Sequence, residues 1–569
     1  MPKAAEDDLE DMMGNLGDFG RYQAWQFSLH IISAVTAGMH MLSLVTVAAV
    51  PDHRCAIPEI DNMFINDSTI NPYLPHNSTD ILSQYIPLSP SGVLDSCYKY
   101  NGTIEDNITV PCTSWVYDTT YYQSSRGMEW NFVCNRRWMG AIAQSAYMLG
   151  VFFGAVTLGG LADKIGRKTV FCWSATLQLV LGVVVAFMPE YFSFLVVRFF
   201  YGVFGSAGAY IPGFVLTMEI VGPSKRTICG IAFQAAFAGG LMLDAAWGAL
   251  IKDRMILQVV YGLHGVFLFF HWWLMDESPR WLWAQGRVNE SVAIVEKAVK
   301  MNKRGIPLDT AHYISRGKIL ASRKDSSNEK TVGAMDLFKT KNIRYKSLNI
   351  CLCWFANSLV YYGLSLSAGK LQGNPFVIMF VSGLVEMPSY TAIVLLLDRL
   401  GRRPLISFMM LTGGICCIVG TYLTQGSIEA TSIIMLGKFF IAGSFAIIYN
   451  YSAELFPTVL RNTGLGIGSM CARLSGTLTP LITLLDSFDP KMPSIIFACI
   501  ALLSGFLTLL LPETMGQPMP QSIEDGEKFG AGDTCFTTGF GRRRRPRRTS
   551  SISPEIKAEH LVPLDNMNK

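Results

Sequence analysis

Charged residues are scarce in this sequence. Asp, Glu, Lys and Arg make up 16% of its 569 residues, whereas about 25% is typical of soluble proteins. The hydrophobic share is 50% and the mean hydropathy is +0.31, so we do not expect a single water-soluble core. The 47 Lys and Arg nearly balance the 43 Asp and Glu, which leaves a net charge of +4. A nucleic-acid partner is therefore not expected.

Motifs of nucleotide and metal chemistry are missing as well. The sequence has no G-x-x-x-x-G-K-[ST] loop to hold the phosphates of ATP, so ATP-driven pumping is not expected. Its eight histidines form no H-E-x-x-H motif. We therefore expect neither an enzyme nor a bound metal or cofactor.

Long apolar runs are abundant instead. Twelve runs have about the 20-residue length that a helix needs to cross a bilayer. They lie at 25–50, 138–160, 169–188, 192–218, 227–249, 258–274, 348–366, 376–397, 404–422, 431–452, 464–484 and 494–511. The first run follows an acidic segment and is longer than the apolar part of a signal peptide, so we interpret it as a membrane helix. The pattern predicts an all-α membrane protein with twelve transmembrane helices.

The polar loop at 51–137 carries a cluster of cysteines and N-x-S/T sequons. Such clustering indicates exposure to the glycosylation machinery in an oxidising compartment, so we expect the loop to be extracellular. The cysteines show no C-x-x-C spacing that would favour zinc, and four of them allow three disulfide pairings. We predict glycans on Asn66, Asn77, Asn101 and Asn107, and disulfides among Cys55, Cys97, Cys112 and Cys134.

Lys and Arg in the short connections predict the orientation. Nine lie in connections assigned to the cytosol and four in connections assigned to the outside, which agrees with an extracellular loop and places both termini in the cytosol. The sequence thus predicts a multi-pass plasma-membrane protein, without order beyond residue 520. Its parts are a cytosolic N-terminus (1–24), a six-helix bundle (25–274), a cytosolic loop (275–347), a second six-helix bundle (348–511) and a cytosolic tail (512–569).

Charged residues in the connections reveal an internal repeat. Three sets recur at an offset of 235 or 236 residues, which indicates a duplicated six-helix unit. Because six crossings return the chain to its starting side, the two copies are parallel repeats. The matching sets are Asp163, Arg167 and Lys168 with Asp398, Arg402 and Arg403; Glu219 and Arg226 with Glu454 and Arg461; and Glu277 with Glu513.

The repeated connection at 159–168 fits the pattern G-x-x-x-D-x-x-G-R-[KR], and the sequence resembles the major facilitator superfamily. Within it, the sequence is similar to the organic cation and anion transporter family of solute carriers, and especially to its invertebrate organic cation transporter-like members. This finer resemblance rests on the long cysteine loop and on D-E-S-P-R-W-L at 276–282, Y-Y-G-L-S at 361–365, V-E-M-P at 385–388 and A-E-L-F-P-T-V-L-R-N at 453–462. The resemblance covers about 17–520 and implies alternating-access transport of small organic ions, facilitative or ion-coupled. A channel or receptor is the alternative class.

Ionisable residues within the apolar runs are candidate substrate contacts, because lipid forces them to face a partner or the protein interior. Mutual ion pairing is the competing explanation. The run at 348–366 also presents rings and hydroxyls on one helical face, and an aromatic ring attracts an organic cation by about 0.5–2 kcal/mol. The candidates are Tyr210, Asp244, Trp354, Ser358, Tyr361, Tyr362, Ser365, Glu386, Lys438, Tyr449 and Arg473.

The charge of the substrate depends most on Arg473. The resemblance implies an acidic residue at this point in cation carriers and Arg in carriers of anions and zwitterions. Basic Lys438 and Arg473 against acidic Asp244 and Glu386 predict a cavity for a zwitterion, such as an amino acid derivative or a carnitine-like molecule. We expect a cation or a zwitterion, with an organic anion as the alternative.

Paired charges at the cytosolic helix ends are candidate gates. We expect Asp163 with Arg167, and Glu219 with Arg226, to latch the two halves together on the cytosolic side; anchoring of the topology is the alternative. The complete gate set is Asp163, Arg167, Lys168, Glu219, Arg226, Asp398, Arg402, Arg403, Glu454 and Arg461.

The cytosolic tail carries a run of six Arg at 542–548. We expect this run to attract anionic lipids of the inner leaflet, by about 1 kcal/mol per charge.

Overall fold

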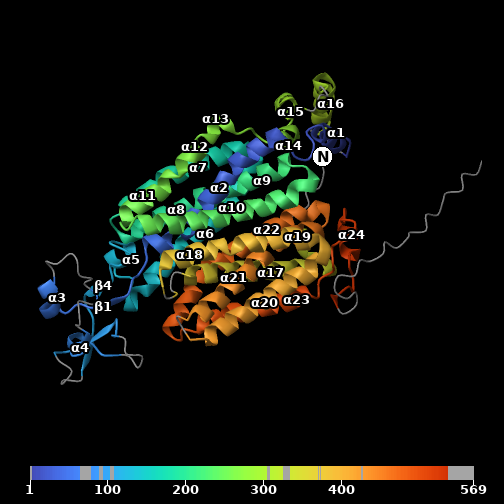
Figure 1. Cartoon of the computed structure of the whole chain (residues 1–569). Helices are drawn as coiled ribbons and strands as arrows, with labels where there is room; N and C mark the ends of the chain where they lie inside the picture. The colour runs from blue at the N-terminus through green and yellow to red at the C-terminus, as the bar shows by residue number, and fades with distance from the viewer. Residues whose placement is uncertain are drawn as a thin grey trace, which may run out of the picture.

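The computed structural model describes residues 3–64, 73, 79–88, 94–102, 108–303, 308–324, 334–368, 371, 373–424 and 427–535. The described chain is almost entirely helical (Figure 1), since helices satisfy their backbone hydrogen bonds internally and can therefore cross lipid. Within these ranges, ten helices are long and apolar enough to span a membrane. Two further helices fall where the last two spans were predicted: α23 (Met492–Thr508), which is shorter, and α22 (Thr458–Thr483), which is rich in Gly, Ser and Thr.

The long helices form two groups that lie side by side in Figure 1. The first group contains α2 (Arg21–Val47), α6 (Arg137–Ile165), α7 (Arg167–Val184) with η3 (Val185–Phe187), α8 (Tyr191–Gly202) continued by η4 (Val203–Tyr210) and α9 (Ile211–Ile220), α10 (Pro223–Leu250), α11 (Arg254–Leu263), α12 (Gly265–Phe269) and α13 (His271–Leu274). The second contains α17 (Lys341–Ala368), α18 (Pro375–Leu384), α19 (Glu386–Leu400), α20 (Arg402–Tyr422), α21 (Ile428–Leu455), α22, η6 (Leu484–Ser487) and α23. The groups meet where α6 packs on α22 and where α10 packs on α18 and α19.

Close helix packing in the first group depends on glycine. A Cβ on Gly38 of α2 would lie 2.1 Å from the Phe237 carbonyl oxygen of α10, and a Cβ on Gly240 of α10 would lie 2.1 Å from the Val35 carbonyl oxygen of α2. Each helix therefore places a glycine against the backbone of the other. Small residues let membrane helices approach in this way, and the contact is then stabilised by dispersion between the backbones.

One end of the bundle carries a small disulfide-bonded domain, at the lower left of Figure 1. In it β1 (His53–Cys55) pairs antiparallel with β4 (Trp115–Tyr117), and β2 (Tyr98–Tyr100) pairs with β3 (Thr109–Pro111), beside α3 (Pro58–Phe64), α4 (Thr79–Leu82), α5 (Arg126–Glu129) and η2 (Cys134–Arg136). Disulfides join Cys55 to Cys112 and Cys97 to Cys134, which selects one of the three pairings. Asn101 is exposed, whereas Asn66, Asn77 and Asn107 lie outside the described residues.

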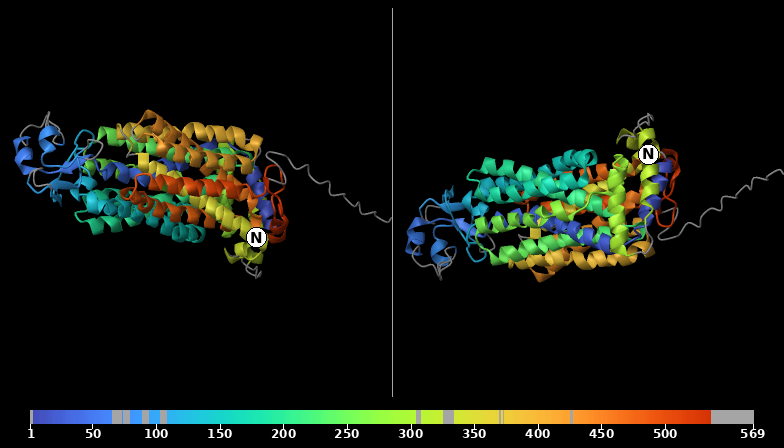
Figure 2. Two further views of the ribbon diagram at one scale, coloured as in Figure 1. Left: turned by 90° about the horizontal axis from the view of Figure 1, so that it is seen from below. Right: turned by 90° about the horizontal axis from the view of Figure 1, so that it is seen from above.

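The opposite end carries the short helices α1 (Lys3–Gly14), α14 (Pro279–Ala284), α15 (Val288–Asn302), α16 (Thr310–Lys324), η5 (Ala334–Phe338) and α24 (Ile523–Lys528), as both views of Figure 2 show. The segment before the first span is thus packed: Leu9 and Met13 of α1 share a core with Val292 and Val299 of α15. The expectation of disorder beyond residue 520 was wrong up to 535, because Lys346 donates to the Gly526 carbonyl at 3.0 Å and ties α24 to α17. The Arg run at 542–548 lies outside the described residues.

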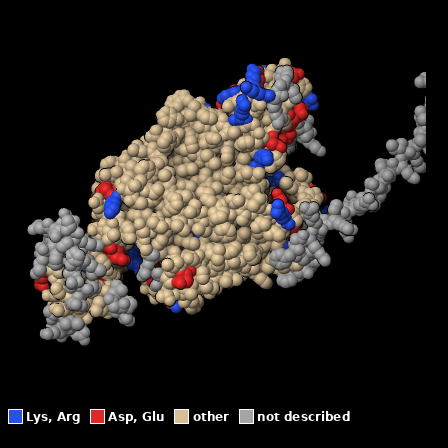
Figure 3. Space-filling view, in the orientation of Figure 1, with Lys and Arg blue, Asp and Glu red and all other residues tan. Residues whose placement is uncertain are grey.

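Charged residues are segregated along the molecule. On the face shown in Figure 3, Lys, Arg, Asp and Glu gather at the two ends and leave a broad band between them without charge. Large apolar side chains such as Trp173, Phe192 and Phe267 are more than half exposed. An uncharged band with exposed apolar side chains is what a protein surrounded by lipid requires.

Candidate functional site

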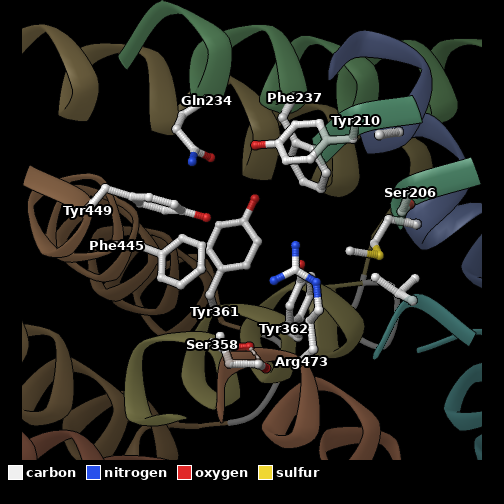
Figure 4. Close-up of a pocket in the computed structure, with 14 residues that line it drawn as sticks. Ser206, Tyr210, Gln234, Phe237, Ser358, Tyr361, Tyr362, Phe445, Tyr449 and Arg473 are labelled. Carbon is white, nitrogen blue, oxygen red and sulfur yellow. Dashed lines mark hydrogen bonds between the residues drawn. The ribbon is translucent and has the colours of Figure 1, made fainter. Parts of the chain in front are cut away.

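A cavity lies between the two groups of helices (Figure 4). Its volume is about 60 Å³, room for a few water molecules. Both groups contribute to its wall, which is largely aromatic. The lining residues are Ala37, Met41, Val151, Ser206, Tyr210, Gln234 and Phe237 from the first group, and Ser358, Tyr361, Tyr362, Phe445, Tyr449, Ala472 and Arg473 from the second.

Helix α17 turns the face that carries the predicted rings and hydroxyls toward this cavity. The residues of that face make two kinds of contact. Ser358, Tyr361 and Tyr362 line the space. Trp354 and Ser365 are buried behind it: the Trp354 indole donates to the Ser452 hydroxyl at 3.0 Å, and the Ser365 hydroxyl donates to the Tyr361 carbonyl at 2.7 Å. These two residues support the wall rather than form its surface.

The rings of the wall contact one another across helices. Tyr361 stacks on Phe445 of α21 with ring centroids 5.8 Å apart, and Trp354 packs edge-on against Tyr449 at 4.4 Å. From the first group, Tyr210 lies 6.0 Å from Phe237. Aromatic pairs at these spacings add about 0.5–1.5 kcal/mol each beyond burial. The rings are thus held in place by one another.

Tyr210 reaches the cavity from a π-helical stretch. Residues Val203–Tyr210 form η4, which interrupts the long helix made of α8 and α9. Glycines at 205 and 208 lie against Gln178 and Ser174 of α7 and hold this wide turn close to its neighbour. Stretches of π-helix in long helices occur frequently at functional sites. Here the stretch also supplies Ser206 to the wall.

Glu386 and Lys438 neutralise each other beside the cavity. The Lys438 ammonium lies 3.2 Å from a Glu386 carboxylate oxygen and donates to Ser365 at 2.6 Å. Tyr361 and Tyr390 donate to the same carboxylate at 3.0 and 2.8 Å. Both charged side chains are buried, and neither lines the space. The pairing therefore accounts for both charges without a ligand.

Arg473 is the cation of the cavity wall. Figure 4 shows its guanidinium pointing between the rings of the wall. One of its terminal nitrogens donates to the Ser469 carbonyl at 3.0 Å and also contacts the Ser469 hydroxyl, and its Nε is buried without a hydrogen-bond partner. Among the residues that the structure describes, no carboxylate lies within 4 Å of it. The lining contains no Asp or Glu, so the wall carries a net positive charge.

Asp244 lies elsewhere. It is buried between α2, α10 and α11, where its carboxylate contacts Thr46 at 3.2 Å, and it does not line the cavity. Conversely, Gln234 and Phe237 of α10 line the space although we did not predict them. A glutamine in the middle of an apolar run was the available signal for Gln234; Phe237 carries no signal that separates it from a packing residue.

The end that bears the disulfide domain is joined across the two groups. Arg137 of α6 pairs with Asp486 of η6 at 2.8 Å, and Ser145 of α6 donates to the Thr477 carbonyl of α22 at 2.8 Å. The ring of Phe376 in α18 lies 5.2 Å from that of Tyr122. A second cavity of about 870 Å³ lies at this end, between the disulfide domain and the helices.

The predicted gate residues form two matching clusters at the opposite end. Arg167 pairs with Asp163 at 3.2 Å and with Glu219 at 2.9 Å. In the second group, Arg402 pairs with Asp398 and Glu454, each at 2.9 Å.

The carboxylates that follow each group join these clusters. Glu277 accepts from the Lys168 backbone amide at 3.0 Å, and Glu513 accepts from the Arg403 backbone amide at 3.2 Å. The same contacts therefore recur in both groups, and each set lies within one group.

Two predicted pairings were wrong. We expected Glu219 to pair with Arg226, and by the repeat Glu454 with Arg461. Arg226 and Arg461 lie on the helices that follow the glutamates, α10 and α22, whereas Arg167 and Arg402 make the ion pairs with Glu219 and Glu454. Arg226 donates to the Val221 carbonyl at 3.1 Å, and Arg461 contacts Thr458 and Met519.

Comparisons with known proteins agree with this architecture. Residues 102–524 match the sugar (and other) transporter family. The chain is 37% identical to the organic cation transporter protein of Drosophila melanogaster over 92% of this chain and 95% of that protein. It is 32% identical to the human organic cation/carnitine transporter 2 over 91% and 93% of the two chains. The solved structure of the major facilitator proton:xylose symporter XylE shares the fold, with a TM-score of 0.55 at 13% identity, covering 89% of this chain and 98% of that one.

Proposed function

Because the chain belongs to the major facilitator superfamily, in the organic cation and anion transporter family, we propose that it carries a small organic zwitterion across the plasma membrane by alternating access. Its relatives are transporters rather than enzymes. The observation that carries the proposal is Arg473, a cation without a carboxylate partner on the wall of an aromatic cavity between the two helix groups.

The substrate class follows from the wall. A guanidinium binds a carboxylate through paired, charge-assisted hydrogen bonds. The rings of Tyr361, Tyr449 and Tyr210 offer faces that attract an ammonium group. A carnitine-like molecule or an amino acid derivative carries both groups. Since the lining has no acidic residue, a purely cationic substrate would meet an uncompensated positive charge, and an organic anion is the better second candidate.

The membrane arrangement is part of the proposal. Adding α22 and α23 to the ten long apolar helices makes twelve spans. The sequons and the Lys and Arg distribution favour an extracellular disulfide domain, with both termini and the short helices at the opposite end in the cytosol.

We further propose that the two six-helix groups are parallel repeats. The matching clusters around Arg167 and Arg402 support this, as do the turns that precede them. Gly166 and Gly401 both have positive φ, +110° and +94°, and at both a Cβ would lie within 3 Å of an oxygen of the following carboxylate, Glu277 or Glu513. Paired helix groups of this kind move against each other around a shared site.

The small volume of the cavity fits a closed stage of the cycle. Sites for drug-sized ligands usually measure about 300–1,000 Å³. The cavity measures about 60 Å³ here, so the two helix groups would have to move apart to admit a substrate. Because the contacts of Arg137 and Phe376 join the groups at the disulfide end, these contacts would have to part before a substrate enters from that side. The proposed cytosolic latch, which also involves Lys168 and Arg403, would act between the groups at another stage, since its ion pairs here lie within each group.

Uptake by reconstituted protein tests the proposal. Proteoliposomes would be offered radiolabelled L-carnitine, tetraethylammonium and p-aminohippurate, a zwitterion, a cation and an anion. Saturable uptake of the zwitterion above the other two is expected, and preference for the cation would refute the assigned substrate class. Flux that does not saturate would favour a channel, and binding without flux a receptor.

A further inference from the structure

Asp244 differs from the other buried carboxylate of the spans. Glu386 has Lys438 as a counterion, whereas no Lys, Arg or His nitrogen of the described residues lies within 4 Å of the Asp244 carboxylate. Its side chain is fully buried, and its Oδ2 has no hydrogen-bond partner. Asp244 lies six residues from the Leu250 end of α10, about 9 Å along the helix. An unpaired carboxylate at such a place has to be neutralised or is strongly disfavoured.

The hydrogen bonds around Asp244 can be counted. The Thr46 hydroxyl oxygen lies 2.9 Å from the Ser43 carbonyl, 3.2 Å from Asp244 Oδ1 and 3.0 Å from the Tyr261 hydroxyl. The Tyr261 hydroxyl also lies 3.0 Å from the Asp244 carbonyl. Thr46 and Tyr261 together have two hydroxyl hydrogens. An ionised Asp244 could therefore receive one hydrogen bond, from Thr46, and its second oxygen would stay without any.

A proton on Asp244 removes the buried charge. The carboxylic acid then donates to Thr46, Thr46 donates to the Ser43 carbonyl, and Tyr261 donates to the Asp244 carbonyl, so that each of three hydrogens has an acceptor. A bound metal ion fits less well, because the described residues hold no group of three or more His, Cys, Asp or Glu around such a site. With a proton, the unpartnered Oδ2 belongs to a neutral acid; without one, it shares a buried negative charge that has no counterion.

The surroundings of Asp244 connect it to the disulfide end. The titratable groups that face it are tyrosines: Tyr261 from α11, Tyr201 from α8 and Tyr122 from the segment before α5. The nearby basic groups turn elsewhere, since His40 contacts the Tyr201 hydroxyl and Arg198 lies over the Tyr147 ring. Tyr122 lines the 870 Å³ cavity and packs on Phe376 of the other helix group. One turn beyond Asp244, a Cβ on Gly248 would lie 2.7 Å from the Phe376 ring.

From this geometry we propose that Asp244 is a proton-binding site coupled to closure of the disulfide end. When Tyr122 and Phe376 part, solvent in the cavity reaches the carboxyl and it ionises. When they meet, Asp244 takes one proton from that solution and is buried as the neutral acid. The inference deepens the proposed function, on which it rests for the movement of the two groups. Coupling arises because the proton binds one conformation better than the other.

The site can be tested without transport. Infrared difference spectra of the full chain in nanodiscs, recorded between about pH 6 and about pH 9, where exposed carboxylates stay ionised, should contain the C=O band of a protonated carboxylic acid. Asp244→Asn should remove this band, and Asp244→Glu should restore a shifted one. Asp489→Asn, which removes an exposed carboxylate near α23, is the matched control and should leave it unchanged. A band that persists in Asp244→Asn, or one that sodium rather than acid controls, overturns the assignment.

The coupling is tested by uptake of L-carnitine into proteoliposomes at varied external pH and constant sodium. Wild type and Asp489→Asn should show the same pH dependence, and Asp244→Asn should lose it while keeping exchange at equal pH on both sides. An unchanged pH dependence in Asp244→Asn refutes the coupling. Absence of carnitine exchange in every variant would refute the proposed function instead, and the infrared band would still decide the proton site.

Discussion

The Lys438 ammonium lies 3.2 Å from the Glu386 carboxylate, and this distance leaves Arg473 as the cation that determines the charge of the cavity. The pair is buried and shares its remaining hydrogen bonds with Ser365, Tyr361 and Tyr390. Its charges therefore cancel within the protein. A ligand in the cavity meets the aromatic rings and the guanidinium.

Breaking this pair should be costly, and removing both charges should not. Lys438→Met alone or Glu386→Gln alone leaves one buried charge uncompensated, and each should lower stability by about 3–5 kcal/mol. The double variant should recover most of the loss. Thermal unfolding of the detergent-solubilised protein measures the effect. Additive losses in the double variant would show that the two side chains do not act as a pair.

Arg473 should control the substrate charge. Arg473→Gln removes the charged hydrogen bonds to a carboxylate, which are worth about 1.5–3 kcal/mol, so carnitine uptake should fall at least about tenfold. Arg473→Lys keeps the charge but not the paired hydrogen-bond geometry, so its carnitine uptake should lie between that of wild type and that of Arg473→Gln. Arg473→Asp should shift the preference toward tetraethylammonium. The radiotracer panel measures all three, and an unchanged preference in Arg473→Asp would remove the assigned role.

The proposed repeat predicts equal effects at equivalent positions. Glu219→Gln and Glu454→Gln each remove the half-buried partner of an Arg, and both should slow transport by a similar factor, about tenfold. Asp163→Ala, whose side chain is 70% exposed, should have less effect. Initial uptake rates, corrected for surface expression, check this. A severe loss confined to one of the two glutamates would speak against equivalent roles.

Neighbouring glycines of α10 provide a packing test. A Cβ at Gly240 would collide with the backbone of α2, whereas one at Gly239 would meet nothing within 4 Å. Gly240→Leu should therefore destabilise the first helix group by at least about 1–3 kcal/mol, and Gly239→Leu should be tolerated. The melting temperatures of the two variants give the comparison. Equal destabilisation would contradict the close contact of α2 with α10.

The sequence predicted the architecture better than the contacts. Hydropathy located the ten long apolar helices of the described residues because lipid imposes a length on each helix, and the 235-residue offset predicted matching contacts for Arg167 and Arg402, each of which pairs with a glutamate of its own group. The ion pairs were harder to predict. The sequence shows Asp244, Glu386, Lys438 and Arg473 as charges in apolar runs, but which of them has a partner depends on how the neighbouring helices pack. The Glu219 pairing was wrong for the same reason, since spacing along the chain does not show which way the next helix turns.

Cross-linking at the disulfide end tests alternating access most directly. In Arg137→Cys/Asp486→Cys, a reducible bifunctional thiol reagent would tie the two helix groups together at the contact that joins them here. Cross-linking should stop carnitine uptake, reduction should restore it, and the two single variants should keep transporting after the same treatment. Undiminished uptake by the cross-linked protein would contradict the claim that the groups separate at this end in every cycle.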